Sequence, residues 1–329
     1  MRAVPFLISA AAAAAAAPLA AQPAPANVST FQTVKQPSFG KVDTTTQADD
    51  VKMRKDEVDR MTVPVRVSGV GPFRFLVDTG ADRTAVSSDL AARVGLAVGE
   101  PAALHTVTGI STVQTATVPD LELSRSSLSI KDAPVLQAAN MGADGILGTD
   151  SLRSQRVVFD FQKNVMTIVP SEEQVPREDG TIIVTGRIRS GRLIVTNAIA
   201  DDQTITVVLD TGSQVSVGNE ALRLRLGNHG QLRSTGAVEL ESVTGEMLQG
   251  EYTFVKKLMV GDVGLSNLAV VFANAHTFKQ LGLDKRPALL LGMNALRAFK
   301  KVSIDFANKK LRVILPESGS LEPVILAAR

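Results

Sequence analysis

The sequence predicts an all-β protein made of two homologous halves in tandem, with a functional site where the halves meet. The first observation is a duplicated stretch, in which an apolar run ends in Asp-Thr-Gly at residues 75–81 and again at residues 207–213. The second is a series of other short motifs repeated in the same order. The third is the alternation of apolar and polar residues in many short segments, which is typical of strands with one buried face.

Each Asp-Thr-Gly motif is expected to place a carboxylate in a tight loop at the end of a buried strand. The apolar residues before Asp78 and Asp210 predict the buried strand. The glycine two residues later permits a sharp turn that a residue with a Cβ atom would resist. Two such loops with matching flanks indicate a pair of carboxylates brought together.

The repeat extends well beyond these loops. The Asp-Thr-Gly motifs lie 132 positions apart, the Val-Thr-Gly motifs 136, the Leu-Gly pairs 144 and the Asp-Phe pairs 145. The order is kept and the offsets grow smoothly, as expected for a duplicated unit with loop insertions in its second copy. Chance would have to supply four ordered matches, so we favour duplication.

Composition restricts the class of function. The 329 residues suffice for two modest domains, and 44% hydrophobic with 21% charged residues is ordinary for a globular protein. A net charge of +2 gives no support for nucleic-acid binding. The chain has no Cys, and its three His, at positions 105, 229 and 276, do not show metal-ligand spacing. We therefore expect neither a cofactor nor a metal.

Residues 1–21 predict a secretory signal peptide. Arg2 precedes an Ala-rich apolar stretch, and small residues precede Gln22. An uncleaved anchor is the alternative, but the stretch is weakly apolar and barely long enough to cross a bilayer. We expect a periplasmic or secreted bacterial protein without stable membrane insertion after cleavage.

The rest of the chain divides by composition. Residues 22–55 are rich in Pro, Gln and Thr and predict a flexible linker or a removable pro-segment. The first half is expected over residues 56–170, a polar interlobe linker over 171–180, and the second half over 181–316. Residues 317–329 are expected to be a C-terminal tail.

The same elements are expected in both halves. In the first, a hairpin over residues 61–77 leads into Asp78, and a helix over 88–94 ends at Gly95. A hairpin around 107–109, a strand over 121–130, a helix over 149–153 and a closing hairpin over 156–169 follow. The second half predicts strands within 181–199 and over 205–209, a helix over 221–226, a hairpin around 243–245, a helix over 293–299 and a closing hairpin over 301–315.

If the two aspartates meet near a quasi-twofold axis, they share one site. Two carboxylates that close cannot both ionise, so one proton is held between them and their titration belongs to the pair. The ionised member can take a proton from water while the protonated member polarises a carbonyl. Peptide hydrolysis needs both acts and requires no metal or nucleophilic side chain.

Over about residues 60–316, the chain resembles the retropepsin-like aspartic proteases. The resemblance rests on the two Asp-Thr-Gly loops, the two glycine-bearing hairpins and the apolar-apolar-Gly stretches at 146–148 and 290–292, with Asp150 and Asn294 two residues after the glycine. It implies two β-barrel lobes in tandem, each with a short C-terminal helix, and an active site between the lobes. Viral members are similar to one half and form homodimers; here two halves are fused, as in the pepsins.

The resemblance also implies roles for individual residues. Asp78 and Asp210 would be the catalytic dyad that activates a water. Thr79 and Thr211 would hydrogen-bond across the interface beneath the dyad. Gly80 and Gly212 would present backbone N–H groups to the carboxylates. The hairpins that contain Thr108, Gly109, Thr244 and Gly245 would be flaps that close over a polypeptide substrate.

The two halves differ directly after the motif, with Ala81 in one and Ser213 in the other. We hypothesise that the Ser213 hydroxyl bonds the outer oxygen of Asp210 and favours its charged form. Asp144 is interpreted as a turn residue rather than a pocket acid, and His105 as a surface residue of the first flap.

Three functions remain open from the sequence. The chain is expected to be an endopeptidase acting on extended polypeptide segments. The alternative is a non-catalytic protein that keeps the fold and binds peptides or a partner. A monomer with an intramolecular dyad is expected, and a dimer in which one half pairs with its counterpart in a second chain is the third case.

Overall fold

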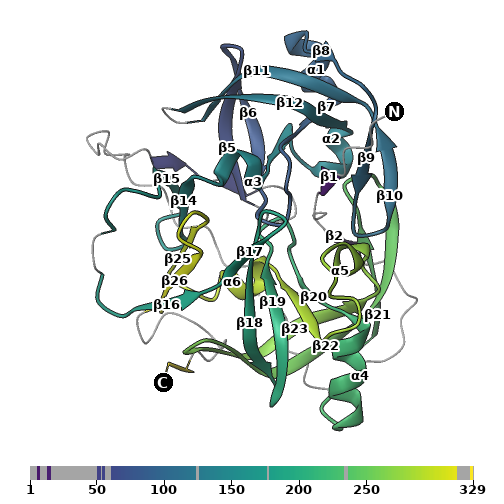
Figure 1. The fold of residues 1–329 in the computed structure, drawn as a ribbon, viewed down its shortest axis with the longest axis vertical. Helices are drawn as coiled ribbons and strands as arrows, with labels where there is room; N and C mark the ends of the chain where they lie inside the picture. Colours follow the sequence, from purple (N-terminus) through teal and green to yellow (C-terminus); the bar gives the residue numbers. More distant parts are fainter. Residues whose placement is uncertain are drawn as a thin grey trace, which may run out of the picture.

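The computed structural model describes residues 6–7, 13–15, 50–52, 54–55, 61–123, 126–175, 178–232, 236–316 and 327–328. Most of the expected signal peptide, of the 22–55 segment and of the C-terminal tail therefore lies outside the described residues. The described chain is mostly β, as the sequence predicts, and forms two lobes that lie one above the other in Figure 1.

Each lobe contains a closed barrel, and the strand order is the same in both. In the first lobe, β5 pairs with β6, β13, β7, β12 and β11 in succession, and β11 pairs back onto β5. In the second lobe the corresponding order is β18, β19, β24, β20, β23 and β22, with β22 pairing back onto β18. The bounds are β5 (Met61–Val67), β6 (Val70–Val77), β7 (Ala85–Ser87), β11 (Thr115–Leu123), β12 (Ser126–Leu136), β13 (Gly145–Leu147), β18 (Arg192–Ala200), β19 (Gln203–Leu209), β20 (Ser216–Gly218), β22 (Met247–Val260), β23 (Val263–Ala273) and β24 (Ala288–Leu291).

The strands that lead to the Asp-Thr-Gly loops lie inside these barrels. Beside β6 runs β13 in parallel, and beside β19 runs β24 in parallel. A strand with neighbours on both sides and both faces covered reads as a continuous apolar run. This is why Phe75-Leu76-Val77 and Val207-Val208-Leu209 are fully apolar, and all six are buried.

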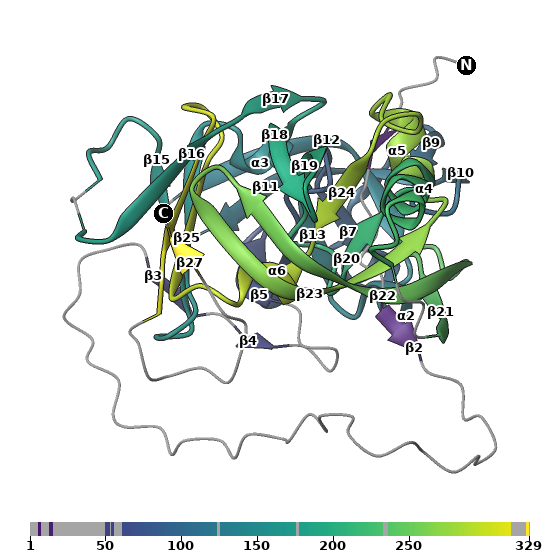
Figure 2. The ribbon, with the colours of Figure 1, turned by 90° about the horizontal axis from the view of Figure 1, so that it is seen from below.

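A third sheet joins the lobes, and its strands come from both halves of the chain. The closing hairpin of each half lies against that of the other, with Val158 opposite Ser303 in the central antiparallel pair. The strand order is β16 (Thr181–Thr185), β26 (Lys310–Ile314), β25 (Lys301–Asp305), β14 (Gln155–Asp160), β15 (Val165–Pro170) and β3 (Asp50–Lys52). This shared sheet lies at the left of Figure 1, away from the hairpins of the Val-Thr-Gly turns, and Figure 2 shows it beside both lobes.

Shorter strands extend these sheets. The first barrel continues into β4 (Arg54–Lys55) and β8 (Ala97–Val98), and the second into β17 (Arg187–Arg189), β21 (Gly236–Glu241), β2 (Ala13–Ala15) and β27 (Ala327–Ala328). A small separate sheet contains β1 (Phe6–Leu7), β9 (Ala102–His105) and β10 (Ile110–Val113). Two pieces of the expected signal peptide, β1 and β2, thus pair with the strands that carry the Val-Thr-Gly turns, β9 and β21.

The helices are short and occupy equivalent places in the two lobes. They are α1 (Ser88–Val94), α2 (Ala138–Met141), α3 (Thr149–Leu152), α4 (Glu220–Asn228), α5 (His276–Gln280) and α6 (Met293–Leu296). Ser87 caps the start of α1 by accepting from the amide of Leu90, and Gly95 ends it in the left-handed conformation that glycine adopts without strain. The expected short helix near the end of each half is present as α3 and α6.

One element of the sequence analysis is wrong. The expected single strand over residues 121–130 is the turn region of a long hairpin, in which Leu123 lies opposite Ser126. Each strand alternates, but the apolar positions change from 121 and 123 to 128 and 130, so the period is interrupted by four polar residues that mark the turn. The helices α2 and α5 were not predicted, since four or five residues are too few to show a helical period.

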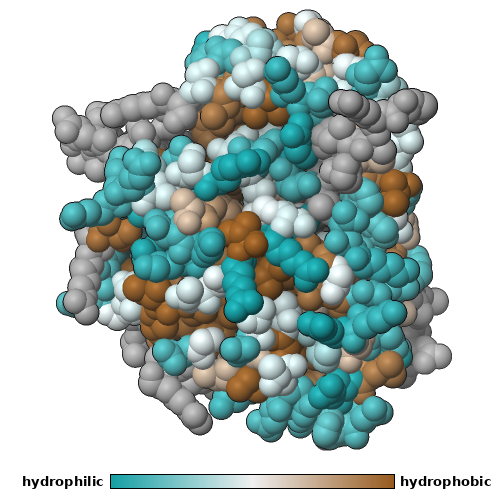
Figure 3. Space-filling view, in the orientation of Figure 1, coloured by the Kyte–Doolittle hydropathy of each residue, from teal (hydrophilic) through white to brown (hydrophobic). Residues whose placement is uncertain are grey.

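The face seen in Figure 3 carries hydrophilic residues throughout, with hydrophobic residues gathered between them. Within the described residues, no helix combines the length and apolar character needed to cross a bilayer.

Candidate active site between the lobes

Asp78 and Asp210 occupy equivalent buried positions at the ends of β6 and β19. Their side chains are 1% and 0% exposed, respectively. The amide of Asp78 donates to Leu147 O at 3.0 Å, and that of Asp210 donates to Leu291 O at 3.1 Å. The neighbouring parallel strand therefore fixes each aspartate where its own strand ends.

Backbone N–H groups hold one oxygen of each carboxylate. Asp78 Oδ1 accepts from Gly80 N at 2.7 Å and from Ala81 N at 3.1 Å. Asp210 Oδ1 accepts from Gly212 N and Ser213 N, both at 3.1 Å. The tight turns thus orient both side chains in the same way relative to their loops.

The two loops are bonded to each other through their threonines. Thr79 N donates to Thr211 Oγ1 at 3.0 Å, and Thr211 N donates to Thr79 Oγ1 at 3.1 Å. The hydroxyl of Thr79 donates to Leu209 O at 3.0 Å, and that of Thr211 donates to Val77 O at 2.6 Å. Four buried hydrogen bonds therefore lock the loops in register across the interface.

The two carboxylates share one desolvated site. Burial, followed by the charge of Asp210, raises the pKa of Asp78 well above its usual range, although N–H donors and Arg192 act in the opposite sense. A Cβ atom on Gly212 would lie 2.2 Å from Asp78 Cγ, so only a glycine lets the opposite loop approach this closely. Asp78 Oδ2 is buried and makes no hydrogen bond within the described residues. A proton shared by the pair is therefore expected to reside on Asp78.

The hypothesis that the Ser213 hydroxyl bonds the outer oxygen of Asp210 is wrong. Its hydroxyl donates to Val215 O at 2.7 Å, so its single proton is not available to Asp210. Ser213 reaches Asp210 through its backbone N–H only, as Ala81 reaches Asp78.

Arg192, at the start of β18, is a buried cation that sequence reasoning missed. It is 1% exposed, and its Nε donates to Gly80 O of the first loop. Burial lowers its pKa, while Asp82, Asp210 and Asp78 act in the opposite sense. The internal repeat could have identified it, because Arg192 lies 18 positions before Asp210 and Arg60 lies 18 positions before Asp78. Arg60 lies outside the described residues.

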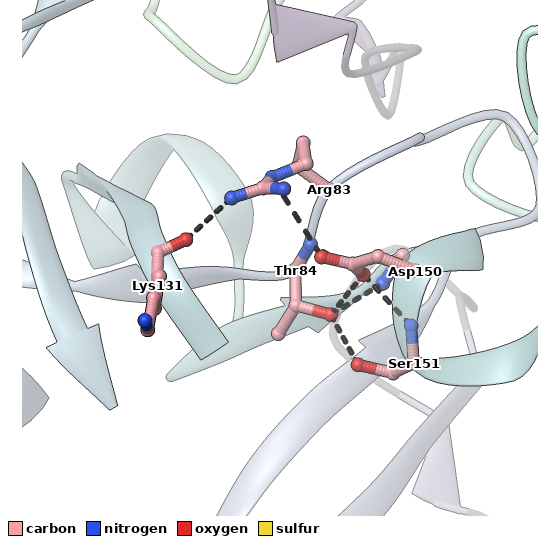
Figure 4. A network of polar contacts seen from close by, with 6 residues as sticks. Arg83, Thr84, Lys131, Asp150 and Ser151 are labelled. Carbon is pink, nitrogen blue, oxygen red and sulfur yellow. Dashed lines mark hydrogen bonds and ion pairs between the residues drawn. The ribbon is translucent and has the colours of Figure 1, made fainter. Parts of the chain in front are cut away.

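A second layer of polar contacts supports each loop from below. Asp150 Oδ1 accepts from Thr84 N at 2.9 Å and from Thr84 Oγ1 at 2.7 Å. In the other lobe, Asn294 Oδ1 accepts from Ser216 N at 2.9 Å and from Ser216 Oγ at 2.8 Å. Figure 4 shows the first-lobe network, in which Arg83 also approaches Asp150. The matched positions Asp150 and Asn294 therefore tie the helices α3 and α6 to the loops.

The turns with Val-Thr-Gly meet across the lobe interface. The hydroxyl of Thr108 donates to the carboxylate of Glu246, and Ser111 Oγ donates to the same carboxylate at 3.2 Å. Gly245 packs against Asn140 of α2, in the opposite lobe. Of the four expected flap residues, Thr108 and Gly245 thus make contacts between the lobes.

The structure corrects the interpretation of His105 as a flap surface residue. His105 is partly buried, and its Nδ1 lies 3.0 Å from Nε2 of His276 in the other lobe. The two residues are separated by 171 positions, so no spacing rule could have joined them. Asp144 is a structural residue, as interpreted, and its carboxylate accepts from Arg74 N at 2.7 Å. Among the described residues, no group of three or more His, Asp or Glu has the arrangement of a metal site.

Comparisons with known proteins agree with the two-lobe organisation. Residues 63–154 match the family model described as gag-polyprotein putative aspartyl protease, and residues 195–295 match the model described as aspartyl protease. Each match contains one Asp-Thr-Gly loop. A retropepsin-like aspartic protease from Rickettsia conorii is a structural match with 21% identity and a TM-score of 0.28, covering 41% of this chain and 89% of that one. No curated protein matches the chain.

Proposed function

Because the chain belongs to the aspartyl proteases, with one protease domain in each half, we propose that Asp78 and Asp210 form its catalytic dyad. In this proposal the enzyme is an endopeptidase that cleaves extended polypeptide segments lying between the dyad and the two flaps. The observation that carries it is the burial of Asp78 beside the charge of Asp210, which raises its pKa. A protonated and an ionised carboxyl group in one site are what acid–base hydrolysis requires.

The proposed steps follow from this assignment. Ionised Asp210 takes a proton from a water whose oxygen attacks the peptide carbonyl carbon. Protonated Asp78 donates to the carbonyl oxygen as negative charge develops there. The tetrahedral intermediate collapses when the C–N bond breaks: protonated Asp210 gives its proton to the leaving nitrogen, and one hydroxyl of the intermediate returns a proton to Asp78. The products are a carboxyl group and an amine, and both aspartates are back in their starting states.

The supporting residues have distinct tasks in this scheme. Thr79 and Thr211 keep the two loops level through their four hydrogen bonds. Gly212 leaves room for the opposite loop to approach, and Gly80 and Gly212 both supply N–H groups to the carboxylates. Preorganised donors of this kind cost little reorganisation during the reaction.

The non-catalytic alternative is disfavoured by the energetics of the site. Burying two carboxylates together penalises their charged forms, which lowers the free energy of unfolding at neutral pH. A peptide-binding protein gains nothing from such a pair, whereas a hydrolase depends on it.

We further propose that the active enzyme is a monomer, because both loops of the dyad belong to one chain and bond to each other. Light scattering with activity measured across dilution tests this. Specific activity that stays constant when only monomer is present supports the proposal, and activity lost with dissociation of a dimer contradicts it.

Export is also part of the proposal and is supported by the sequence of residues 1–21. Expression in a bacterial host, followed by N-terminal sequencing of the periplasmic fraction, tests it. A mature terminus shortly after Ala21 is expected, and a cytoplasmic protein that begins at Met1 would refute export.

The catalytic proposal is tested with an unfolded protein mixture as substrate. Cleavage products are identified by mass spectrometry for the parent enzyme and for Asp78→Asn and Asp210→Asn. These substitutions keep the shape of the side chain and remove its acid–base chemistry. New termini with the parent only are expected; equal cleavage by both variants would disprove the dyad.

A further inference from the structure

A pair of imidazoles joins the first flap to the opposite lobe. His105 ends β9, which carries the first flap, and His276 begins α5 of the second lobe. Their nitrogens are 3.0 Å apart, and their rings stack with centroids separated by 5.2 Å and planes inclined by 19°. Next to this pair, the amide of His276 donates to Val107 O at 2.7 Å. The flap therefore bonds to the second lobe through both a side chain and the backbone.

The corresponding contact at the second flap is built differently. Glu241 precedes its Val-Thr-Gly by two positions, as His105 does in the first flap. The wall opposite the second flap is α2, where Asn140 meets Gly245. The imidazole pair is thus an addition to the duplicated architecture, present on one side only within the described residues.

We propose that His105 and His276 are positioning residues that form a latch, which holds the first flap over the cleft and opens when both imidazoles are protonated. The inference rests on the proposed function, in which this hairpin is a flap above the dyad. The latch controls access to the cleft and takes no part in the chemistry.

The protonation chemistry of the pair explains why acid should open the latch. When both rings are neutral, one N–H donates to the unprotonated nitrogen of the other. A first added proton leaves that bond in place, because an imidazolium can still donate to a neutral imidazole. The second proton must bind at the accepting nitrogen, which removes the acceptor and sets two like charges against each other.

Burial and nearby positive charges lower the pKa of both histidines while the flap is closed. Burial, then His276 and Arg192, lowers the pKa of His105, and burial followed by Lys279 lowers that of His276. Opening relieves these effects, so the open state binds more protons and is favoured as pH falls below about 6.5, the ordinary value for histidine. Between the pKa values of the two states, the ratio of closed to open molecules falls by up to about tenfold per pH unit for each proton taken up. The carboxylate of Glu246, which holds Thr108 and Ser111, is a second tether at the flap tip.

The flap position is measurable without catalysis. The chain has no Cys, so spin labels can be attached at two introduced cysteines only. Ile110 on the flap strand β10 and Leu224 on α4 of the second lobe are 60% and 51% exposed. Double electron–electron resonance on Ile110→Cys/Leu224→Cys is expected to give one distance at pH 8 and a growing second population below about pH 6.

Matched variants separate the latch from other effects of acid. His105→Asn with His276→Gln keeps hydrogen-bonding groups near both ring nitrogens but does not titrate, so its flap should stay closed throughout. His105→Ala loses the imidazole bond but keeps the His276 amide bond and the Glu246 tether, so at pH 8 its open population should exceed that of the parent. His229→Gln should behave like the parent. Acid opening in the Asn/Gln variant, or no opening in the parent, would overturn the latch. Since the distance needs no turnover, an inactive dyad would leave this result intact.

Discussion

Replacement of Thr211 by Val is the sharpest test of how the two lobes are held together. Valine has nearly the shape of threonine but neither donates nor accepts a hydrogen bond. The change removes the bond from Thr79 N at 3.0 Å and the bond to Val77 O at 2.6 Å. Both partners remain buried, so each loses its hydrogen bond without gaining water.

The expected loss of stability follows from the two groups left without a hydrogen bond, Thr79 N–H and Val77 O. A buried donor or acceptor left unsatisfied costs about 1–3 kcal/mol, so the loss in the free energy of unfolding should be about 2–6 kcal/mol. This is a large share of the roughly 5–15 kcal/mol that stabilises ordinary proteins. Thr211→Ser is the matched control, because it keeps both hydrogen bonds and removes only a methyl group. Thr79→Val should cost a similar amount, since it breaks the equivalent bonds to Leu209 O and from Thr211 N.

The assay is calorimetry at neutral pH, because the chain has no Trp and one Tyr and gives little fluorescence. At about 2 °C per kcal/mol for a protein of this size, Thr211→Val should melt about 4–12 °C below the parent. The melting temperature of Thr211→Ser should fall by only a small fraction of that amount. If the Val and Ser variants melt at the same temperature, the crossed hydrogen bonds do not hold the interface and the reasoning is wrong.

Four further predictions concern the environment of the dyad and the shared sheet. Gly212→Ala should abolish activity or folding, because the added Cβ would lie 2.2 Å from Asp78 Cγ; a fully active variant by peptide-cleavage assay would contradict the close approach of the two loops. The raised pKa of Asp78 means that the proton is lost as pH rises through that value, so kcat/KM should decline on the alkaline side. Arg192→Met removes a charge that lowers the pKa of Asp78, so this alkaline limb should move to higher pH, and a shift to lower pH would refute the assignment. Burial raises the pKa of Asp305, but hydrogen bonds from Asn308 and Arg312 outweigh it and lower that pKa on balance. The contribution of Asp305 to stability should therefore be present above the ordinary pKa and disappear in acid, as urea titrations of Asp305→Asn against the parent would reveal.

The features that the sequence predicted well are those that repeat. Asp78 and Asp210 could be paired because the same loop occurs twice at a steady offset, and Asp150 and Asn294 because each follows an equivalent Gly. Gly95 could be placed at a helix end because a left-handed residue there favours glycine. Such features depend on local conformation, which neighbouring residues determine.

The features that the sequence missed depend on groups brought together from distant positions. The sequence does not show which acceptor the Ser213 hydroxyl uses, and in the folded loop it is Val215 O rather than Asp210. The guanidinium of Arg192 reaches Gly80 O from the other lobe, which no local pattern encodes. The shared sheet likewise required two closing hairpins to pair with each other rather than with their own barrels.

By itself, the sequence determined that this protein is a tandem duplicate with one buried carboxylate loop in each half, because strand periodicity, turn chemistry and internal repetition are written along the chain. The tertiary structure alone decided that Asp78 is buried beside Asp210, which cation lies near the pair and which imidazoles meet between the lobes. Those outcomes depend on burial and on distances between residues far apart in sequence, and both exist only once the lobes have packed together.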